Sequence, residues 1–179
     1  MDYGPIYFWT ATINSWRRIL QSDHFKDEIV GSLKVLSDRR KIDVFGFVIM
    51  PNHMHLIWRI LEPNGKERPQ GSLLKFTAHQ FKKMLINEAG YGVLHPYLVD
   101  AHNKLYEFWQ PDPLAIPLYT RAIAFQKLTY THHNPLAERW KLALTTEEYK
   151  YSSAKYYTTG IDDFGFLRNL HEEFYLSQR

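Results

Sequence analysis

Apolar and β-branched residues in the first third of the chain predict three strands and one helix. Residues 6 to 13 (IYFWTATI) are mostly β-branched or aromatic, which is typical of a strand. Residues 23 to 38 carry apolar side chains three or four positions apart, which predicts a helix with Asp23 as a candidate N-cap. Residues 42 to 50 and 53 to 61 predict two more strands. Because only two residues separate these strands, we expect an antiparallel hairpin.

The remaining chain alternates loops with helical patterns. A polar loop at 62 to 71 precedes a predicted helix at 72 to 89, and another helix is predicted at 118 to 134. Between these helices, residues 90 to 117 are interrupted by glycine and proline, with a short strand expected at 104 to 109. This order of elements predicts an α+β fold, in which helices pack mainly on one face of an antiparallel sheet.

Composition narrows the class of protein. A chain of 179 residues with 45% hydrophobic and 23% charged residues favours a single globular domain. The absence of cysteine excludes a disulfide framework and a thiolate zinc site. No apolar run approaches the roughly 20 residues that span a bilayer. The N-terminus lacks the basic region and cleavage site of a signal peptide. We therefore expect a cytoplasmic protein with no membrane partner.

Charge and aromatic content favour a nucleic-acid partner. The formal net charge is +3, the pI is about 9.0, and 16% of residues are aromatic. Cations pair with phosphates and aromatic rings stack on bases, although many enzymes share this charge and most rings fill cores. Each basic side chain taken alone is more often a solvated surface charge. The candidate backbone contacts are Arg17, Arg18, Arg39, Arg40, Lys41, Lys82 and Lys83.

The stretch PNHMHLIW at 51 to 58 places two histidines within an apolar strand pattern. Because side chains alternate along a strand, His53 and His55 share one face, and the apolar positions 54, 56, 58 and 60 face the core. Two neighbouring imidazoles suit a shared divalent metal ion and leave coordination positions open for substrate. The alternative is a pair of surface histidines near a hairpin turn. A third ligand must come from elsewhere in the fold.

The second half of this candidate site lies in LTYTHHNP, residues 128 to 135. On a helix, Tyr130 and Asn134 share one face, so a phenol nucleophile and an amide oxygen ligand would project together. Tyr130 is alternatively a packed amphipathic residue. Asn134 is alternatively the N-cap of a short helix at 135 to 140, with proline at its first position. His133 is a substitute ligand or proton carrier.

Four motifs in order resemble the REP-associated tyrosine transposases of the HUH single-tyrosine superfamily. They are FVIMPNHMHLIW, FWQ at 108 to 110, YTHHNP at 130 to 135 and EEYKYSSAKYY at 147 to 157. The resemblance implies a ferredoxin-like core and a divalent metal, Mg²⁺ or Mn²⁺, held by His53, His55 and Asn134. It also implies that Tyr130 cleaves single-stranded DNA, leaving a 5′-phosphotyrosine and a 3′-OH, and that DNA hairpins are recognised. The stretch PDPLAIPL at 111 to 118 departs from the family pattern.

The resemblance assigns residues 1 to 160 to an HUH single-tyrosine transposase domain and residues 161 to 179 to a C-terminal helix or tail. Single-stranded or hairpin DNA is the expected partner. The sequence does not decide between a monomer and a homodimer. One alternative is a non-catalytic nucleic-acid-binding module on a ferredoxin-like sheet, with rings such as Phe8 or Trp58 stacking bases. Another is a metal-dependent hydrolase that uses activated water and does not need Tyr130.

Overall fold

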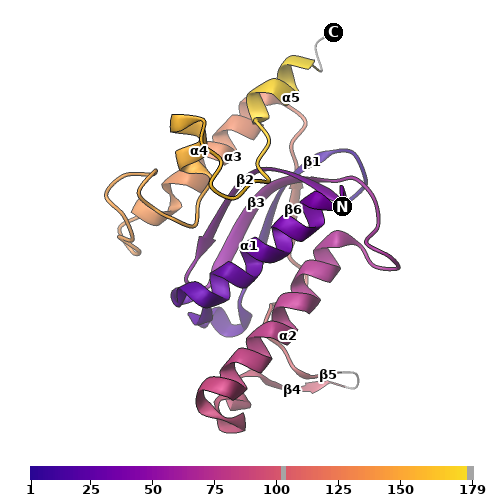
Figure 1. Cartoon of the computed structure of the whole chain (residues 1–179), viewed down its shortest axis with the longest axis vertical. Helices are drawn as coiled ribbons and strands as arrows, with labels where there is room; N and C mark the ends of the chain where they lie inside the picture. Colours follow the sequence, from indigo (N-terminus) through magenta and orange to yellow (C-terminus); the bar gives the residue numbers. More distant parts are fainter. Residues whose placement is uncertain (102–103, 177–179) are drawn as a thin grey trace.

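A four-stranded antiparallel sheet forms the centre of the computed structural model, which describes residues 1–101 and 104–176 (Figure 1). Its strands lie in the order β2-β3-β1-β6, and every neighbouring pair is antiparallel. The strands are β1 (Ile6–Thr12), β2 (Ile42–Met50), β3 (His53–Ile60) and β6 (Leu114–Pro117). The predicted α+β class with an antiparallel sheet is confirmed.

The β2–β3 hairpin follows the predicted register, with Met50 opposite His53. β2 is buried along its whole length because other elements cover both of its faces. The register shifts between Val44 and Gly46, which is a β-bulge. A Cβ added at Gly46 would lie 2.7 Å from Leu128 Cδ1, so glycine at this position allows a helix to pack closely on the strand.

One face of the sheet is covered by the helix α1 (Asp23–Asp38), which packs against α2 (Pro69–Ala89). Both bounds of α1 match the prediction, but the N-cap is Ser22, so the expectation that Asp23 caps the helix is wrong. Asp23 is instead the first helical residue, and its carboxylate accepts a hydrogen bond from Lys26. α2 begins three residues earlier than predicted, because proline suits the first helical position.

The opposite face carries α3 (Arg121–His133), whose Ala124 and Leu128 pack on Phe8 and Ile57. The helix begins later than the predicted residue 118, because the Thr120 hydroxyl accepts a hydrogen bond from a backbone N–H and caps it. α5 (Leu170–Leu176) packs on this face as well. The helices are thus divided between the faces, with the two longest on one side (Figure 1).

Short elements connect these layers. Three 3₁₀ segments, η1 (Asn14–Trp16), η2 (Ile19–Gln21) and η3 (Tyr91–Tyr97), lie in loops, and η4 (Asn134–Leu136) continues α3. β4 (Leu98–Ala101) and β5 (Lys104–Tyr106) form a separate ribbon, so the strand expected at 104 to 109 is shorter than predicted. β6 was not predicted, because it is short and contains proline. Its position at the sheet edge explains why proline is tolerated there.

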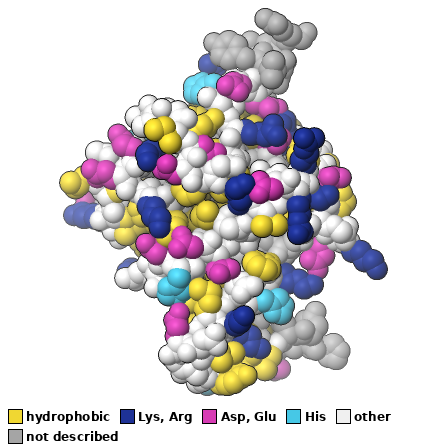
Figure 2. All heavy atoms as spheres, viewed as in Figure 1, with side chains coloured by type: hydrophobic (Ala, Val, Ile, Leu, Met, Phe, Trp, Pro, Cys, Tyr) yellow, Lys and Arg dark blue, Asp and Glu magenta, His cyan; other side chains and the backbone are white. Residues whose placement is uncertain are grey.

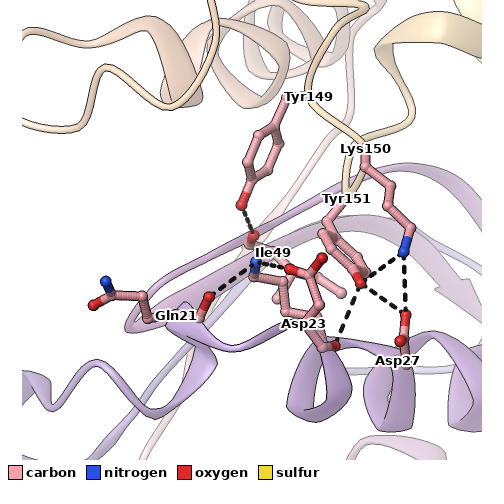
Figure 3. Close-up of polar contacts among 8 residues, drawn as sticks. Gln21, Asp23, Asp27, Ile49, Tyr149, Lys150 and Tyr151 are labelled. Carbon is pink, nitrogen blue, oxygen red and sulfur yellow. Dashed lines mark hydrogen bonds and ion pairs between the residues drawn. The ribbon is translucent and has the colours of Figure 1, made fainter.

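The segment that follows η4 is attached to both α1 and β2 (Figure 3). Tyr149 donates a hydrogen bond to the carbonyl of Ile49 at 2.7 Å, and Tyr151 donates one to Asp27 at 2.8 Å. The buried Lys26 ammonium lies 4.5 Å from the centroid of the Tyr151 ring. These contacts hold the motif EEYKYSS against the sheet before α4 (Ala154–Thr159) begins.

The expected C-terminal helix or tail at 161 to 179 contains α5, and its residues 177 to 179 lie outside the described residues. α5 is joined to the sheet through Arg59 on β3, which pairs with Glu173 and Asp43. Among the described residues, no helix is long and apolar enough to cross a membrane.

Candidate functional site

His53 and His55 lie side by side on the α3 face of β3, with ring centroids 4.8 Å apart. The alternate positions Met54, Leu56, Trp58 and Ile60 lie in the main core, as the strand alternation predicts. The two histidines are only 4% and 5% exposed. They are therefore not surface residues near a turn, and their burial needs another explanation.

Hydrogen bonds fix how each imidazole is presented. Asn52 Nδ2 donates to the carbonyl of Trp16 at 3.2 Å, so Asn52 Oδ1 accepts from His53 Nδ1 at 2.7 Å. His53 Nε2 therefore keeps its lone pair. On the neighbouring strand, Thr10 Oγ1 lies 2.8 Å from His55 Nδ1, and His55 Nε2 is buried without a hydrogen-bond partner among the described residues. This is the pattern of metal-binding histidines, in which an outer partner orients the ring.

Both imidazoles are electrically neutral at physiological pH. Burial lowers the pKa of His53 to about 4, with a smaller effect from the positive charge of Arg139. Burial likewise lowers the pKa of His55 to about 3, helped by His53, Lys127 and Arg139. The pair is therefore held in the only protonation state that can donate a nitrogen lone pair to a cation.

α3 brings Tyr130 to this pair. The Tyr130 ring centroid lies 5.4 Å from that of His55 and 6.0 Å from that of Phe8. Tyr130 is 48% exposed, so one side of its ring packs on Phe8 and His55 and the other side is open to solvent. One turn later, Asn134 is buried at 5% exposure. Tyr130 and Asn134 both line a hollow of about 270 Å³, together with His133, Ala137 and Arg139.

The alternative role for Asn134, as the N-cap of a helix at 135 to 140, is wrong. Asn134 has helical backbone angles and is the first residue of η4, whose N-cap is His133 with no side-chain capping bond. The side-chain nitrogen of Asn134 is buried with no hydrogen-bond partner among the described residues. Capping therefore does not account for this amide, which lies at the hollow with unused hydrogen-bonding capacity.

The two histidines after Tyr130 have different environments. His132 is buried, and its Nε2 lies 2.8 Å from the hydroxyl of Ser153. The same hydroxyl accepts a hydrogen bond from the backbone N–H of Phe47, so this contact links α3 to β2. Burial lowers the pKa of His132 to about 4. His133 is exposed, and its Nδ1 lies 2.9 Å from the carbonyl of Thr129.

Several residues at this site were not predicted. The Lys127 ammonium lies 4.8 Å from the centroid of the Phe8 ring and 5.8 Å from that of Tyr130. The sequence could have indicated Lys127, because this residue lies three positions before Tyr130 on the same helical face. The Trp140 ring centroid lies 6.0 Å from that of His53, and Arg139 lines the hollow. Both residues belong to a turn, and local sequence spacing does not show where a turn places its side chains.

The available donors limit which ion the site could hold. Among the described residues, no three His, Cys, Asp or Glu side chains are close enough to bind one metal. Two neutral imidazoles therefore need a ligand of another type, such as an amide oxygen or water. Nitrogen and neutral oxygen donors with open positions are compatible with a catalytic divalent cation.

The predicted DNA-contacting cations are dispersed. The Arg18 guanidinium lies 5.4 Å from the Trp140 ring centroid, next to the histidines, and that of Arg17 lies 5.4 Å from the Tyr97 ring centroid. The run of residues 39 to 41 lies at the other end of β3 from His53, roughly 20 Å along the strand. The remaining cations are on α2, where the Lys82 ammonium lies 4.6 Å from the Tyr106 ring centroid and Lys83 is exposed.

The face covered by α1 carries charges of both signs. Figure 2 shows lysine and arginine interspersed with aspartate and glutamate there. Lys41, for example, pairs with Glu62 at 2.9 Å. Of the seven predicted cations, Arg18 is the one that the structure connects to the histidine pair through a shared aromatic neighbour.

Comparison with known proteins identifies a structural relative. No family model and no curated protein matches the chain. Among solved structures, the chain is similar to a REP-associated tyrosine transposase bound to a REP hairpin, with a TM-score of 0.60. The match covers 94% of this chain and 88% of that chain at 16% sequence identity. The chain therefore shares the fold of that transposase, in agreement with its antiparallel sheet and helices.

Proposed function

We propose that this protein is a metal-dependent transposase-type enzyme that cleaves and rejoins single-stranded DNA through Tyr130. The observation that carries the proposal is the half-exposed Tyr130 ring beside a buried, neutral His55 whose Nε2 has no hydrogen-bond partner among the described residues. The shared fold with a transposase bound to a DNA hairpin supports it. Hairpin DNA is accordingly the proposed recognition element.

His53, His55 and Asn134 are the proposed ligands of one Mg²⁺ or Mn²⁺ ion. When bound, the ion would withdraw charge from the scissile phosphate and favour the phenolate of the nucleophile. The contacts of Asn52 and Thr10 would hold the two imidazoles in the orientation that binding requires. The protein thereby positions the ligands before substrate arrives.

The proposed reaction transfers a phosphoryl group to Tyr130. The phenol oxygen loses its proton and forms a bond to phosphorus, while the bond from phosphorus to the 3′ oxygen breaks and that oxygen takes up a proton. The products are a 5′-phosphotyrosine and a free 3′-OH. The Lys127 ammonium lies 5.8 Å from the centroid of the Tyr130 ring, where its positive charge would stabilise a DNA phosphate held near the phenol. Attack by the 3′-OH of another strand reverses the step and frees Tyr130, so rejoining needs no external energy source.

One chain supplies every proposed group. The 5.4 Å between the Tyr130 and His55 ring centroids is a distance within a single chain. The proposed catalysis therefore uses residues of one chain and does not require a homodimer. A homodimer for DNA binding is still compatible with the proposal.

The two competing functions make different demands on the structure. A binding module that stacks bases on Phe8 or Trp58 does not agree with it, because these rings are 3% and 0% exposed. A hydrolase that uses activated water would share the histidines but would cleave without forming a covalent adduct.

A single-stranded oligonucleotide, labelled at either end and incubated with Mn²⁺, tests the proposal. We expect the 5′-labelled fragment to be released with a 3′-OH and the 3′-labelled fragment to stay attached to the protein in denaturant. Tyr130→Phe should abolish both products, whereas Tyr119→Phe, at an exposed tyrosine before α3, should leave both unchanged. Cleavage without an adduct would support the hydrolase, and binding without cleavage would support the binding module.

A further inference from the structure

Trp16 is held in an unusual way beside the histidine pair. It is 61% exposed, whereas Trp9, Trp58 and Trp109 are buried and Trp140 is partly buried. Trp16 and the preceding Ser15 have φ values of 58° and 55°, in the left-handed region that favours glycine. The left-handed backbone conformation is unfavourable for these non-glycine residues, and such strained backbone clusters at functional sites.

The loop that carries Trp16 is attached to the histidines by one side chain. Asn52 Nδ2 donates to the Trp16 carbonyl, and Asn52 Oδ1 accepts from His53 Nδ1. Backbone hydrogen bonds also hold the loop, because the N–H of Ile13 donates to the carbonyl of Asn52 at 2.8 Å and the N–H of Asn14 donates to the carbonyl of Phe108 at 2.7 Å. The position of Trp16 and the orientation of the His53 imidazole are therefore set by the same amide.

Two cations follow Trp16 in the sequence. Arg17 follows it directly and is restrained, because its guanidinium donates to the Asn14 carbonyl at 3.1 Å and lies over the Tyr97 ring. Arg18 lies over Trp140, whose ring centroid is 6.0 Å from that of His53. An exposed ring followed by two positive side chains is the combination that binds single strands, since bases stack on the ring and phosphates pair with the cations.

We infer that Trp16 is the stacking platform for one unpaired nucleobase of the DNA strand whose phosphate lies at Tyr130. This inference rests on the proposed function, because it takes single-stranded DNA as the substrate. Stacking on Trp16 fixes the strand relative to Asn52, and hence relative to His53. The indole thus holds the substrate in register with the proposed reaction centre. A protein partner for this ring is the alternative that the test excludes.

Binding measurements in a Tyr130→Phe background test the inference without cleavage. A set of oligonucleotides, each with one abasic nucleotide, should contain one whose missing base weakens binding by about 5- to 150-fold. Trp16→Ala should weaken binding of the intact strand by a similar factor, after which the abasic change at that position should cost nothing further. Trp16→Phe should retain most of the affinity. Tyr119→Ala, at a side chain 79% exposed elsewhere, is the matched control and should change nothing.

A second variant removes unfolding as an explanation. Trp16→Gly relieves the positive φ, so it should fold at least as stably as the parent and still lose affinity. If the loss of affinity caused by Trp16→Ala simply adds to the loss at every abasic position, the stacking assignment is overturned. Unchanged affinity in Trp16→Ala would also overturn it, even if Tyr130 forms an adduct in the parent protein. Coupled penalties in a protein that forms no adduct would support Trp16 and contradict the catalytic proposal, so the two failures are distinguishable.

Discussion

The two faces of β3 are buried to almost the same extent but contain different chemistry. Met54 and Leu56 face α1, have no polar side-chain group and are fully buried in the main core. His53 and His55 face α3 and are nearly as buried, yet each retains a polar ring. Packing offsets the cost of burying the apolar pair, whereas the imidazoles lose hydration and His55 Nε2 gains no hydrogen bond from the described residues.

This difference in buried chemistry is the reason for placing the proposed site on the α3 face. The hollow between α1 and α2 has a volume of about 710 Å³, against about 270 Å³ beside Tyr130. Size alone would therefore favour the side of the sheet opposite to the proposed site. What distinguishes the α3 face is that its desolvated imidazoles lie beside the half-exposed Tyr130, the proposed nucleophile. On the other face, Trp58 Nε1 also has no hydrogen-bond partner among the described residues, but it is enclosed in the apolar core. The following predictions test that distinction.

The largest expected effect is the difference between alanine substitution of His55 and of its neighbour Leu56. His55→Ala should abolish cleavage and also the rise in melting temperature that Mn²⁺ gives the parent protein, a stabilisation of about 2.7 kcal/mol at 100 times the dissociation constant. Leu56→Ala should lose about 2 to 5 kcal/mol of stability through the cavity it creates but keep the Mn²⁺-dependent rise. Thermal unfolding with and without Mn²⁺ measures both. A rise that persists in His55→Ala would place the metal elsewhere.

Lowering the pH should destabilise the protein through the buried histidines on the α3 face. His53, His55 and His132 have folded pKa values of about 4, 3 and 4, below the ordinary 6.5. Between about pH 6.5 and 4 the unfolded chain therefore binds more protons, so stability present above pH 6.5 is lost as the pH falls. Each histidine should contribute a loss of roughly 1 to 2 kcal/mol between pH 7 and pH 5. Urea unfolding in EDTA at these two pH values measures the sum, and an unchanged free energy of unfolding would mean that the imidazoles are protonated in the folded protein.

A smaller effect is expected at Asn134. Asn134→Ala should raise the Mn²⁺ concentration needed for half-maximal cleavage by about tenfold or more, because an oxygen ligand is lost. Asn134→Asp should keep or lower that concentration, because a carboxylate replaces the amide at the same reach. His133→Ala is the matched control on the same turn. If the control rather than Asn134→Ala changes the metal requirement, His133 is the third ligand.

The smallest expected effects concern the cations. Lys127→Gln and Arg139→Gln should each weaken binding of single-stranded DNA and reduce the slope of log affinity against log salt by about 1. Arg39→Gln, at the other end of β3, should change neither quantity. Titrations at two or more salt concentrations measure both. Equal effects at Arg39 and Lys127 would show that the DNA also crosses the end of the sheet near α1.

The spacing of apolar residues predicted the regular strands and the first helix of the fold. Three strands, the hairpin and α1 follow from alternation and helical spacing, and this also placed the two histidines on one face. β6 was missed because a four-residue edge strand with proline has the composition of a loop. The start of α3 was placed too early because the capping role of Thr120 was not identified.

The site was predictable only as far as local spacing reaches. Tyr130 and Asn134 share a helical face, and Lys127 could have been added by the same rule. Asn52, Trp16 and Trp140 meet the histidines through tertiary contacts that no spacing reveals. Local charge density also does not show which end of a strand a basic run occupies. The run at 39 to 41 consequently lies far from His53.

Mapping the covalent adduct by mass spectrometry tests the central claim most directly. The protein would be incubated with Mn²⁺ and a single-stranded oligonucleotide carrying the cleavage site, denatured, digested with protease and nuclease, and searched for a phosphotyrosine bearing a nucleotide. We expect this mass on the peptide that contains Tyr130 and on no other. The same mass on Tyr119 or Tyr149, the latter bonded to Ile49, would contradict the assignment of the nucleophile and with it the proposed site on the α3 face.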